Sequence, residues 1–503
     1  MRFPRRSGIL LHPTSLPGPH GSGDFGPDAD RFVDWLAEAG QSLWQVLPLG
    51  GIGPGDSPYM SNSAFAGNVL LIELGELQRR GWLRADEIAP DAGLQARRVD
   101  FAAMVPFRMA RLALAAERFA ASARAEERAD LDDFVRRHAD WLPDYALFMA
   151  LAEHQGWRDW CEWPDGLASR EPAALEAARR VHATRIAFWT FCQWCFFRQW
   201  ARVREHAHAR GVRIVGDMPI FLAYQSADVW AQPHLFDLDA QGRPTVVAGV
   251  PPDGFSATGQ RWGNPLYRWS AHAQAGYAWW IERVRRTFEL VDIVRIDHFR
   301  GFAAHWEIRV SEPTAQRGHW EPGPGEALFR AVADALGPLP IIAEDLGVIT
   351  PDVDALRRAF AFPGMRILQF AWGEDQAAER RFLPHRYEPD TVVYTGSHDN
   401  DTTVGWWASA PEGTRHHLRE YLATDGRAIH WDMVRAACAS VADTAVYPLQ
   451  DVMGLDSAHR MNFPGQPAGW WAWRFVWEQL PADAASRLRR MGELYDRLPP
   501  APR

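Results

Sequence analysis

Cysteine is scarce in this chain, which has four Cys among 503 residues. So few thiols cannot crosslink a secreted protein of this length, and we therefore predict a reducing compartment, the cytoplasm. Cys192 and Cys195 form a C-x-x-C pair, but it lies in the aromatic, helical segment AFWTFCQWCFFRQW without a second Cys pair. We interpret both side chains as buried core thiols rather than as redox or zinc groups.

Long apolar runs and dense basic tracts are also missing. No apolar stretch reaches the ~20 residues of a membrane-spanning helix, and the run in MRFPRRSGILLHPTS is shorter than the ~7–15 residues of a signal-peptide core. The net charge is −9. Nucleic acid and anionic membrane are therefore not expected as partners, because both require a basic surface. A neutral ligand fits this charge better, and some of the 25 Trp could bind the flat faces of sugar rings.

Motifs for metals and phosphates are absent as well. The chain has no H-E-x-x-H spacing, no D-x-D-x-D-G loop and no Walker-type loop. We accordingly predict no metal and no cofactor.

Strand and helix signals alternate along most of the chain. Short runs rich in Val and Ile, bounded by Gly or polar residues, predict buried parallel strands with helices between them. The predicted strands are QSLWQVLPLG, VRIVGD, VDIVRID, LPIIAED, MRILQFAW, TVVYTGSHD and TAVYPLQD, with GNVLLIEL as a candidate eighth. The predicted fold class is therefore α/β, a (β/α)8 TIM barrel. An open doubly wound sheet is the alternative, but no G-x-G-x-x-G follows any of these strands.

The chain is predicted to form a single catalytic domain over residues 1–503, with two distinct segments. Residues from about 85 to 210 are rich in Ala, Arg, Glu and Trp, with apolar residues at helical spacing, which indicates a mainly helical insertion. Residues 249–265 are punctuated by Gly and Pro and carry one Trp and several polar groups. We interpret this second segment as a loop lying over a cleft, with an ordinary surface connection as the alternative.

Acidic residues stand where several predicted strands end. Asp297 ends VDIVRID, Glu344 follows LPIIA, Asp399 follows TVVYTGSH, and Asp217 follows VRIVG. A carboxylate at the end of a buried strand has no packing function, whereas in a parallel barrel these ends converge on the catalytic face. Each acid alone could cap a helix or pair with a basic residue. Together they favour one catalytic pocket.

Neighbouring residues suggest different roles for these acids. Arg295 lies two positions before Asp297, so both side chains point to the same side of the strand, and the guanidinium favours a charged, nucleophilic carboxylate. Glu344 has no basic neighbour in sequence, and burial near other acids would keep it protonated, as a proton donor requires. Asp345 should point away from Glu344 and serve the structure. His298 and His398 adjoin the acids and could contact a sugar hydroxyl or orient a carboxylate.

These residues carry a family resemblance. VRIDHFRGF, AEDLG, YTGSHDND and GDMPIF resemble the four conserved regions of the α-amylase superfamily. The particular residues of these motifs are similar to those of the 4-α-glucanotransferase family, which is also called amylomaltase or disproportionating enzyme and forms glycoside hydrolase family 77. RSGILLHPTSLPGPHGSGDFG, GDSPYMSNSAFAGN, GVPPDGFSATGQRWGNPLY and HRMNFPG extend the match from about Ser7 to Trp473.

The resemblance implies a retaining transfer of α-1,4-glucan segments between maltooligosaccharides through a covalent glycosyl–enzyme intermediate. It makes Asp297 the nucleophile, Glu344 the general acid/base and Asp399 the acid that supports the transition state. It also implies a set of residues that bind the substrate: Ser57, Tyr59, Asp217, Gln260, Trp262, Asn264, Arg295, His298, Phe370, His398 and Asn462. Two rival functions remain open: a hydrolase of the same superfamily, and a non-catalytic protein that binds starch or glycogen.

Overall fold

A closed ring of parallel strands forms the centre of the protein. The computed structural model describes residues 3–89, 92–95, 97–252, 256–373, 380–466 and 468–499. Within them, eight parallel strands form one sheet in the order β10-β11-β12-β1-β2-β3-β6-β9. In chain order these strands are β1 (Arg6–Leu10), β2 (Leu43–Gln45), β3 (Arg213–Pro219), β6 (Ile293–Asp297), β9 (Ile341–Ala343), β10 (Gly364–Ile367), β11 (Thr391–Tyr394) and β12 (Thr444–Pro448). The predicted (β/α)8 barrel is confirmed.

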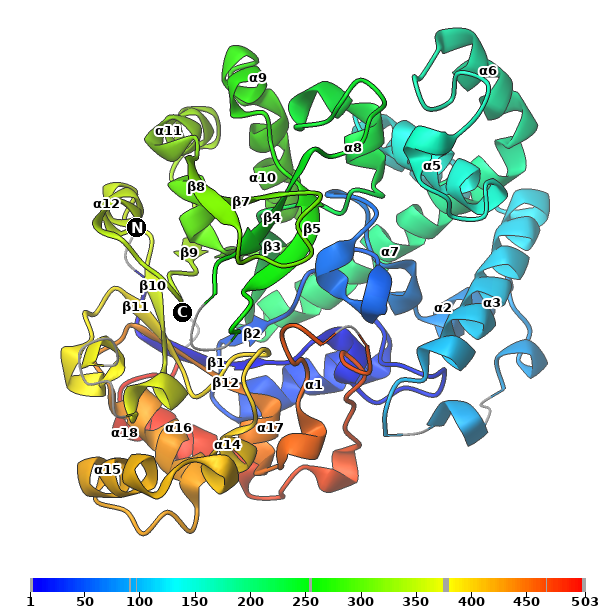
Figure 1. Cartoon of the computed structure of the whole chain (residues 1–503). Coiled ribbons are helices and arrows are strands. Elements are labelled where there is room, and N and C mark those ends of the chain that lie inside the picture. Colours follow the sequence, from blue (N-terminus) through cyan, green and yellow to red (C-terminus); the bar gives the residue numbers. More distant parts are fainter. Residues whose placement is uncertain are drawn as a thin grey trace.

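Amphipathic helices surround the ring (Figure 1). In α1, the buried residues Ala29, Phe32, Val33 and Leu36 form one stripe at helical spacing. The outer helices are α1 (Pro27–Glu38), α10 (Ala278–Leu290), α11 (Gly325–Leu336), α12 (Pro351–Ala359), α16 (Ile429–Ala439) and α18 (Ala484–Leu494). Shorter helices in the connections are α2 (Leu74–Arg79), α8 (Ala227–Ala231), α9 (Trp269–Gln274), α14 (Thr403–Ser409), α15 (Glu412–Leu422) and α17 (Leu449–Met453). Among the described residues, no helix combines the length and the apolar character needed to cross a bilayer.

The ring closes between β9 and β10 with the help of a buried carboxylate. The Ala343 N–H donates to the Pro363 carbonyl at 2.9 Å. Beside this bond, the Asp345 carboxylate accepts from the Met365 N–H at 2.6 Å and pairs with Arg366 at 3.1 Å. Both oxygens of Asp345 are thus used in bonds that join the end of β9 to β10, which agrees with the structural role expected for this residue.

Among the described residues, the segment between β2 and β3 contains five α-helices after α2. They are α3 (Phe101–Ser122), α4 (Ala125–Arg137), α5 (Leu142–His154), α6 (Pro172–Val181) and α7 (Ala183–Ala209). Cys192 and Cys195 lie in α7 as free, buried thiols, and burial raises the pKa of Cys195 to about 12. Neither thiol is therefore reactive, and the interpretation as core residues is confirmed. The division of the chain into a catalytic domain and an insertion stays a prediction.

The candidate eighth strand, GNVLLIEL, was wrong. Residues 67–74 instead form a single 3-10 turn, Val69–Leu71, which leads into α2. Gly67 finds its partner in a side chain: its N–H donates to Gln193 Oε1 at 2.8 Å, and its carbonyl accepts from Gln193 Nε2 at 2.9 Å. Asn68 then caps the turn by accepting from the Leu70 N–H. Hydrogen bonds with the Gln193 side chain and with the Asn68 cap thus take the place of the backbone bonds that a strand would make with its neighbours.

The eighth strand is β1, which we did not predict. It is only five residues long, and its basic start gave no strand signal. Its fit depends on a close approach to β2: a Cβ on Gly8 would lie 2.4 Å from the Leu43 carbonyl oxygen. Glycine is needed here because the neighbouring strand leaves no room for a side chain.

A second, antiparallel sheet lies over one side of the barrel. It has the order β5-β4-β7-β8 and contains β4 (Val246–Val250), β5 (Gln260–Pro265), β7 (Ala304–Arg309) and β8 (Gly318–Pro322). Residues 249–265, predicted as a loop, therefore belong mostly to the β4–β5 hairpin; residues 253–255 lie outside the described residues. The polar sequence of β5, QRWGNP, carries no strand pattern, and its conformation depends on pairing with β4.

Candidate active site

Three strand-end carboxylates meet around one arginine. Arg295 projects from β6 and donates from Nη1 to both oxygens of Asp217 on β3, at 2.7 and 2.6 Å. The same nitrogen lies 3.1 Å from Asp297 Oδ1, and Nη2 lies 3.4 Å from Glu344 Oε2, just after β9. Because β3, β6 and β9 are neighbours in the ring, their ends bring these groups together.

The charges in this cluster do not balance. Arg295 is 3% exposed, and burial alone would lower its pKa, but the carboxylates, Asp217 foremost, raise the pKa well above its usual value. One permanent cation therefore faces three carboxyl groups. Burial raises the pKa of Glu344 to about 8, an effect that Arg295 opposes and the charge of Asp297 reinforces. Glu344 thus holds a proton at neutral pH, which relieves the excess negative charge.

The exposed fraction of each carboxyl side chain shows which of these acids a ligand could reach. The Asp217 side chain is 0% exposed, Glu344 is 17% exposed and Asp297 is 26% exposed. Asp217 therefore acts on its neighbours and has no free surface for a ligand, whereas Asp297 and Glu344 each keep part of their side chain exposed.

His298 connects Asp297 to Glu344 through the main chain. Its backbone is left-handed, with φ 51°, and its N–H donates to Glu344 Oε2 at 2.5 Å. This conformation is uncommon for a residue with a side chain, and such strain is concentrated at functional sites. Burial lowers the pKa of the imidazole to about 4, so the ring is neutral, and its buried Nε2 has no hydrogen-bond partner among the residues that the structure describes. A ligand hydroxyl could satisfy that nitrogen.

Asp399 lies in the segment after β11 and is the most exposed of the acids, at 42% of its side chain. Its Oδ1 accepts from Asn462 Nδ2 at 2.6 Å, and its Oδ2 lies 3.4 Å from His398 Nε2. The charge of Asp399 also raises the pKa of Glu344, which places it within electrostatic range of the cluster. Asn462, predicted to bind substrate, thus also holds a catalytic candidate.

Tyr59 links the acid cluster to the segment that carries Asp399. Its hydroxyl donates to Asp217 Oδ2 at 2.9 Å and lies 2.9 Å from His398 Nε2, with the two rings stacked at 5.4 Å. Since the phenol proton goes to Asp217, His398 Nε2–H is the donor in the second bond. Ser57 supports this arrangement, because its Oγ accepts from the Tyr59 N–H and caps the 3-10 turn Pro58–Met60.

The antiparallel sheet contributes an aromatic wall. Trp262 on β5 meets the His298 ring edge to face, with centroids 4.8 Å apart, and its Nε1–H donates to Gln260 Oε1 at 3.1 Å. Asn264, at the end of the same strand, is buried and donates to the Leu222 carbonyl at 2.7 Å. Its amide nitrogen is therefore used by the protein. Phe370 packs edge to face on Phe382 at 5.4 Å, and its place on a glucan path stays a prediction.

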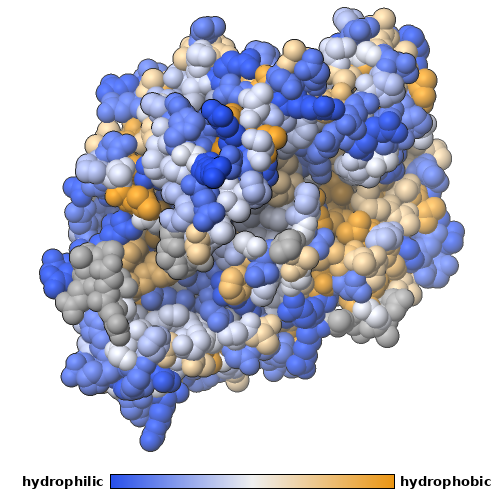
Figure 2. Space-filling model, viewed as in Figure 1, coloured by the Kyte–Doolittle hydropathy of each residue, from blue (hydrophilic) through white to orange (hydrophobic). Residues whose placement is uncertain are grey.

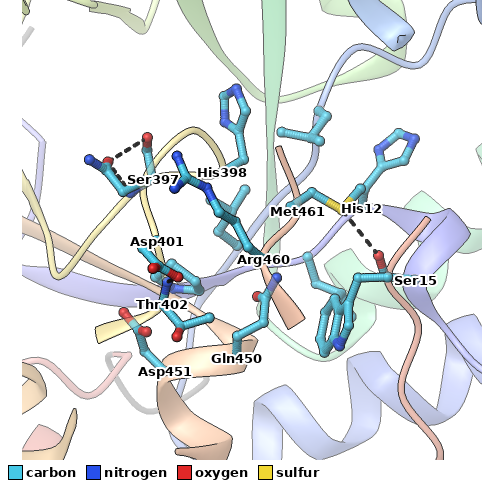
Figure 3. A pocket seen from close by; sticks show the side chains of 16 residues that line it. His12, Ser15, Ser397, His398, Asp401, Thr402, Gln450, Asp451, Arg460 and Met461 are labelled. Atoms are coloured by element: carbon cyan, nitrogen blue, oxygen red, sulfur yellow. Dashed lines mark hydrogen bonds between the residues drawn. The ribbon is translucent and has the colours of Figure 1, made fainter. Parts of the chain in front are cut away.

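Arg460 is a residue of the site that we did not predict. It donates from Nη2 to the Asp399 carbonyl and from Nε to the Asn462 carbonyl. Together with His398 it lines a small pocket behind the segment that carries Asp399, with about 20 Å³ of free space, enough for about one water molecule (Figure 3). HRMNFPG contains Arg460, but sequence spacing does not connect it to Asp399. Among the described residues, no group of three or more His, Cys, Asp or Glu is arranged to hold a metal ion.

Comparisons with known proteins agree over the whole chain. A family model described as 4-alpha-glucanotransferase matches residues 11–479. The chain is 50% identical to a 4-alpha-glucanotransferase of Thermus thermophilus, over 99% of this chain and 100% of that protein. It is 45% identical to a chloroplastic/amyloplastic 4-alpha-glucanotransferase of Solanum tuberosum, over 98% and 87% of the two chains. The structure matches an amylomaltase from Streptococcus agalactiae in complex with acarbose, with a TM-score of 0.95, 38% identity, and coverage of 98% and 100%.

The raised pKa of Glu344 predicts a measurable pH dependence of stability. Between its usual pKa near 4.5 and about 8, the folded state keeps the Glu344 proton whereas the unfolded chain releases it. The free energy of unfolding therefore falls as pH rises through this window, with a slope of up to about 1.4 kcal/mol per pH unit from this group. Glu344→Gln removes that contribution, so the variant should gain stability relative to the wild type from pH 5 to pH 8 in urea unfolding. If the free energy of unfolding changes with pH equally in the wild type and in Glu344→Gln, Glu344 is not protonated in the folded state at neutral pH.

Proposed function

The chain belongs to the 4-alpha-glucanotransferase family, and from that premise we propose that it transfers α-1,4-glucan segments between maltooligosaccharides by a retaining double displacement. The observation that supports this best is the pair of unlike carboxyl groups on one guanidinium, Asp297 and Glu344. Retention requires a nucleophile and a proton donor ~5–5.5 Å apart, and sharing Arg295 keeps the two groups close.

In the first step, an Asp297 oxygen attacks the anomeric carbon of the donor glucan. The bond to the leaving oxygen breaks as Glu344 gives that oxygen its proton, so the shortened glucan departs neutral. Asp297 is paired with Arg295, and the raised pKa of Glu344 provides the proton. The product of this step is a covalent glycosyl ester on Asp297.

In the second step, Glu344, now ionised, takes the proton of an acceptor 4-hydroxyl, whose oxygen attacks the anomeric carbon and releases Asp297. Asp399 would stabilise the positive charge that develops on the sugar in both transition states, because it is the exposed acid held outside the Arg295 cluster. His298 and His398 would bind hydroxyls of the sugar at the cleavage point. Tyr59 keeps the two halves of the site in register through its bonds to Asp217 and His398.

The small antiparallel sheet would favour the acceptor sugar over water. Trp262 lies on the hairpin against His298, so its ring borders the cleavage point. Figure 2 shows this face of the molecule hollowed beside the sheet, with hydrophobic side chains among hydrophilic ones. A flat aromatic face binds a sugar ring and displaces water from the space that it fills.

Product analysis with maltotriose separates transfer from hydrolysis. A transferase converts maltotriose into glucose and a ladder of longer maltooligosaccharides, which chromatography resolves. A hydrolase of the same superfamily yields only shorter products. An inactive wild-type protein would favour the non-catalytic binding protein.

The covalent intermediate can be trapped directly. A fluorinated maltosyl donor that slows the second step should add one maltosyl mass to the wild-type protein, located by peptide mass spectrometry on Asp297. Asp297→Asn should form no adduct and lose at least about 10⁴-fold in kcat, since it lacks the nucleophile. Retained activity or an adduct on another residue would overturn this assignment. Asp133→Asn, which alters an exposed ion pair with Arg136, provides a control that should form the adduct normally.

Removing the aromatic wall should shift the reaction towards water. Trp262→Ala is expected to raise the ratio of hydrolysis to transfer by about 10-fold, because one side-chain contact with the acceptor contributes on the order of 1–2 kcal/mol. The ratio follows from free glucose and ladder products measured in the same maltotriose reaction. Trp306→Ala is the matched control, since Trp306 lies on β7 of the same sheet and packs on Val247, Ile308 and Ala315. If the ratio of hydrolysis to transfer is unchanged in Trp262→Ala, the Trp262 side chain does not select the acceptor.

A further inference from the structure

The segment that carries Asp399 is fixed at both ends by one buried carboxylate, Asp451. The segment runs from Thr395, after β11, to Thr402, before α14. Asp451 Oδ2 accepts from the Thr395 hydroxyl at the start of the segment. At the other end, Asp451 Oδ1 accepts from the Thr403 N–H at 2.7 Å, and Oδ2 accepts from the Thr403 hydroxyl at 2.8 Å. Two residues eight positions apart are thereby held to the same side chain.

Asp451 itself is held rigidly. It belongs to the short helix α17, directly after β12, and is 1% exposed. Burial raises the pKa of this carboxyl group, and the bonds from Thr395 and Thr403 oppose that rise. Burying a carboxyl group among hydroxyls costs more free energy than burying an apolar side chain of the same size. The three hydrogen bonds from Thr395 and Thr403 offset this cost, so the carboxyl group is tied to the two residues that it holds.

The middle of the segment is held from the other side. Arg460 donates to the Asp399 carbonyl, and Asn462 donates from its backbone to the His398 carbonyl at 3.1 Å and from its side chain to Asp399 Oδ1. Figure 3 shows Asp451 at the end of the pocket away from His398, with Asp401 and Thr402 between them. The 395–402 segment is thus fixed at its start, middle and end, and Asp451 provides two of these three attachments.

We propose that Asp451 is a positioning residue that sets the orientation of Asp399 through Thr395 and Thr403. This inference rests on the proposed function, in which Asp399 stabilises the transition state. A carboxylate accepts from both hydroxyls at once, whereas an amide must donate with its nitrogen, so the bond to at least one threonine has to rearrange. A shift of about 1 Å at a group that stabilises charge can lower the rate by about 10²-fold.

The test combines Asp451→Asn with Asp399→Asn in a double-mutant cycle. Asp451→Asn keeps the side-chain size and should lower kcat on maltotriose by about 10- to 100-fold with KM changed less than about threefold, since a displaced Asp399 weakens transition-state contacts. With a maltosyl fluoride donor, which needs less acid assistance, the residual rate of Asp399→Asn becomes measurable. In that background Asp451→Asn should cause no further loss.

Threonine variants keep the proposal testable if Asp451→Asn folds poorly. Thr403→Val, which loses the hydroxyl, should lower kcat as Asp451→Asn does, and Thr403→Ser, which keeps it, should restore the rate. Asp24→Asn is the control, because Asp24 is a buried acid paired with Arg108 far along the chain from the segment. Its melting temperature should fall with kcat unchanged.

Three outcomes would overturn the inference. An unchanged kcat in Asp451→Asn, an equal loss in the Asp399→Asn background, or equal rates for Thr403→Val and Thr403→Ser would each show that Asp451 does not act through Asp399. Wild-type activity in Asp399→Asn would instead show that the proposed role of Asp399 is wrong, so the two failures are distinguishable.

Discussion

The site depends on a charge imbalance: one buried guanidinium, Arg295, is shared by three carboxyl groups. A buried cluster cannot keep two uncompensated negative charges, so one group has to hold a proton. Asp217 takes two hydrogen bonds from the arginine, and Asp297 takes one directly from its terminal nitrogen. Burial raises the pKa of Asp217 as well, a rise that Arg295 opposes, whereas Glu344 has the weakest contact with Arg295, at 3.4 Å, and a pKa raised to about 8. The proposed acid, Glu344, and the proposed nucleophile, Asp297, thus differ in how strongly each one interacts with the shared arginine.

The barrel makes such sharing possible because it brings side chains from distant parts of the sequence to neighbouring strand ends. Asp217 and Asp297 stand on paired strands, with Pro219 opposite Asp297 in the register. The alternation of side chains along β6 then places Arg295 and Asp297 on the same side. Asp345 shows the reverse case, since one step past Glu344 the carboxylate turns to the seam of the ring and bonds Met365. Two adjacent acids, Glu344 and Asp345, therefore face different surroundings: the first lies at the proposed active site and the second at the seam of the ring.

Much of this could be predicted from the sequence, because strand ends and period-two spacing are local signals. The convergence of Asp217, Asp297 and Glu344 follows from those signals together with the barrel. The strand β1 and the hairpin strand β5 could not be predicted, since Gly8 and the polar sequence QRWGNP reflect close approach and pairing with other strands. Arg460 and Asp451 belong to the same class. The partner of Arg460 lies 61 residues away and those of Asp451 lie 56 and 48 residues away, and no spacing rule connects a buried acid in a short helix to a catalytic candidate.

The two parts of the site are therefore encoded differently, and they would control different properties of the reaction. In the proposed mechanism, Glu344 could deprotonate either water or a sugar 4-hydroxyl, so the acids would determine retention but not the choice of acceptor. That choice would depend on which molecule occupies the space beside the proposed covalent intermediate. The antiparallel sheet borders this space through Trp262, at 4.8 Å from the ring of His298. Trp262 contacts the ring of His298 and has no ion pair or hydrogen bond with Arg295 among the described contacts, so we expect a change of that side chain to alter the acceptor without disturbing Arg295. A barrel with the same acids could thus catalyse either hydrolysis or transfer, depending on the side chains that the antiparallel sheet places beside the cleavage point.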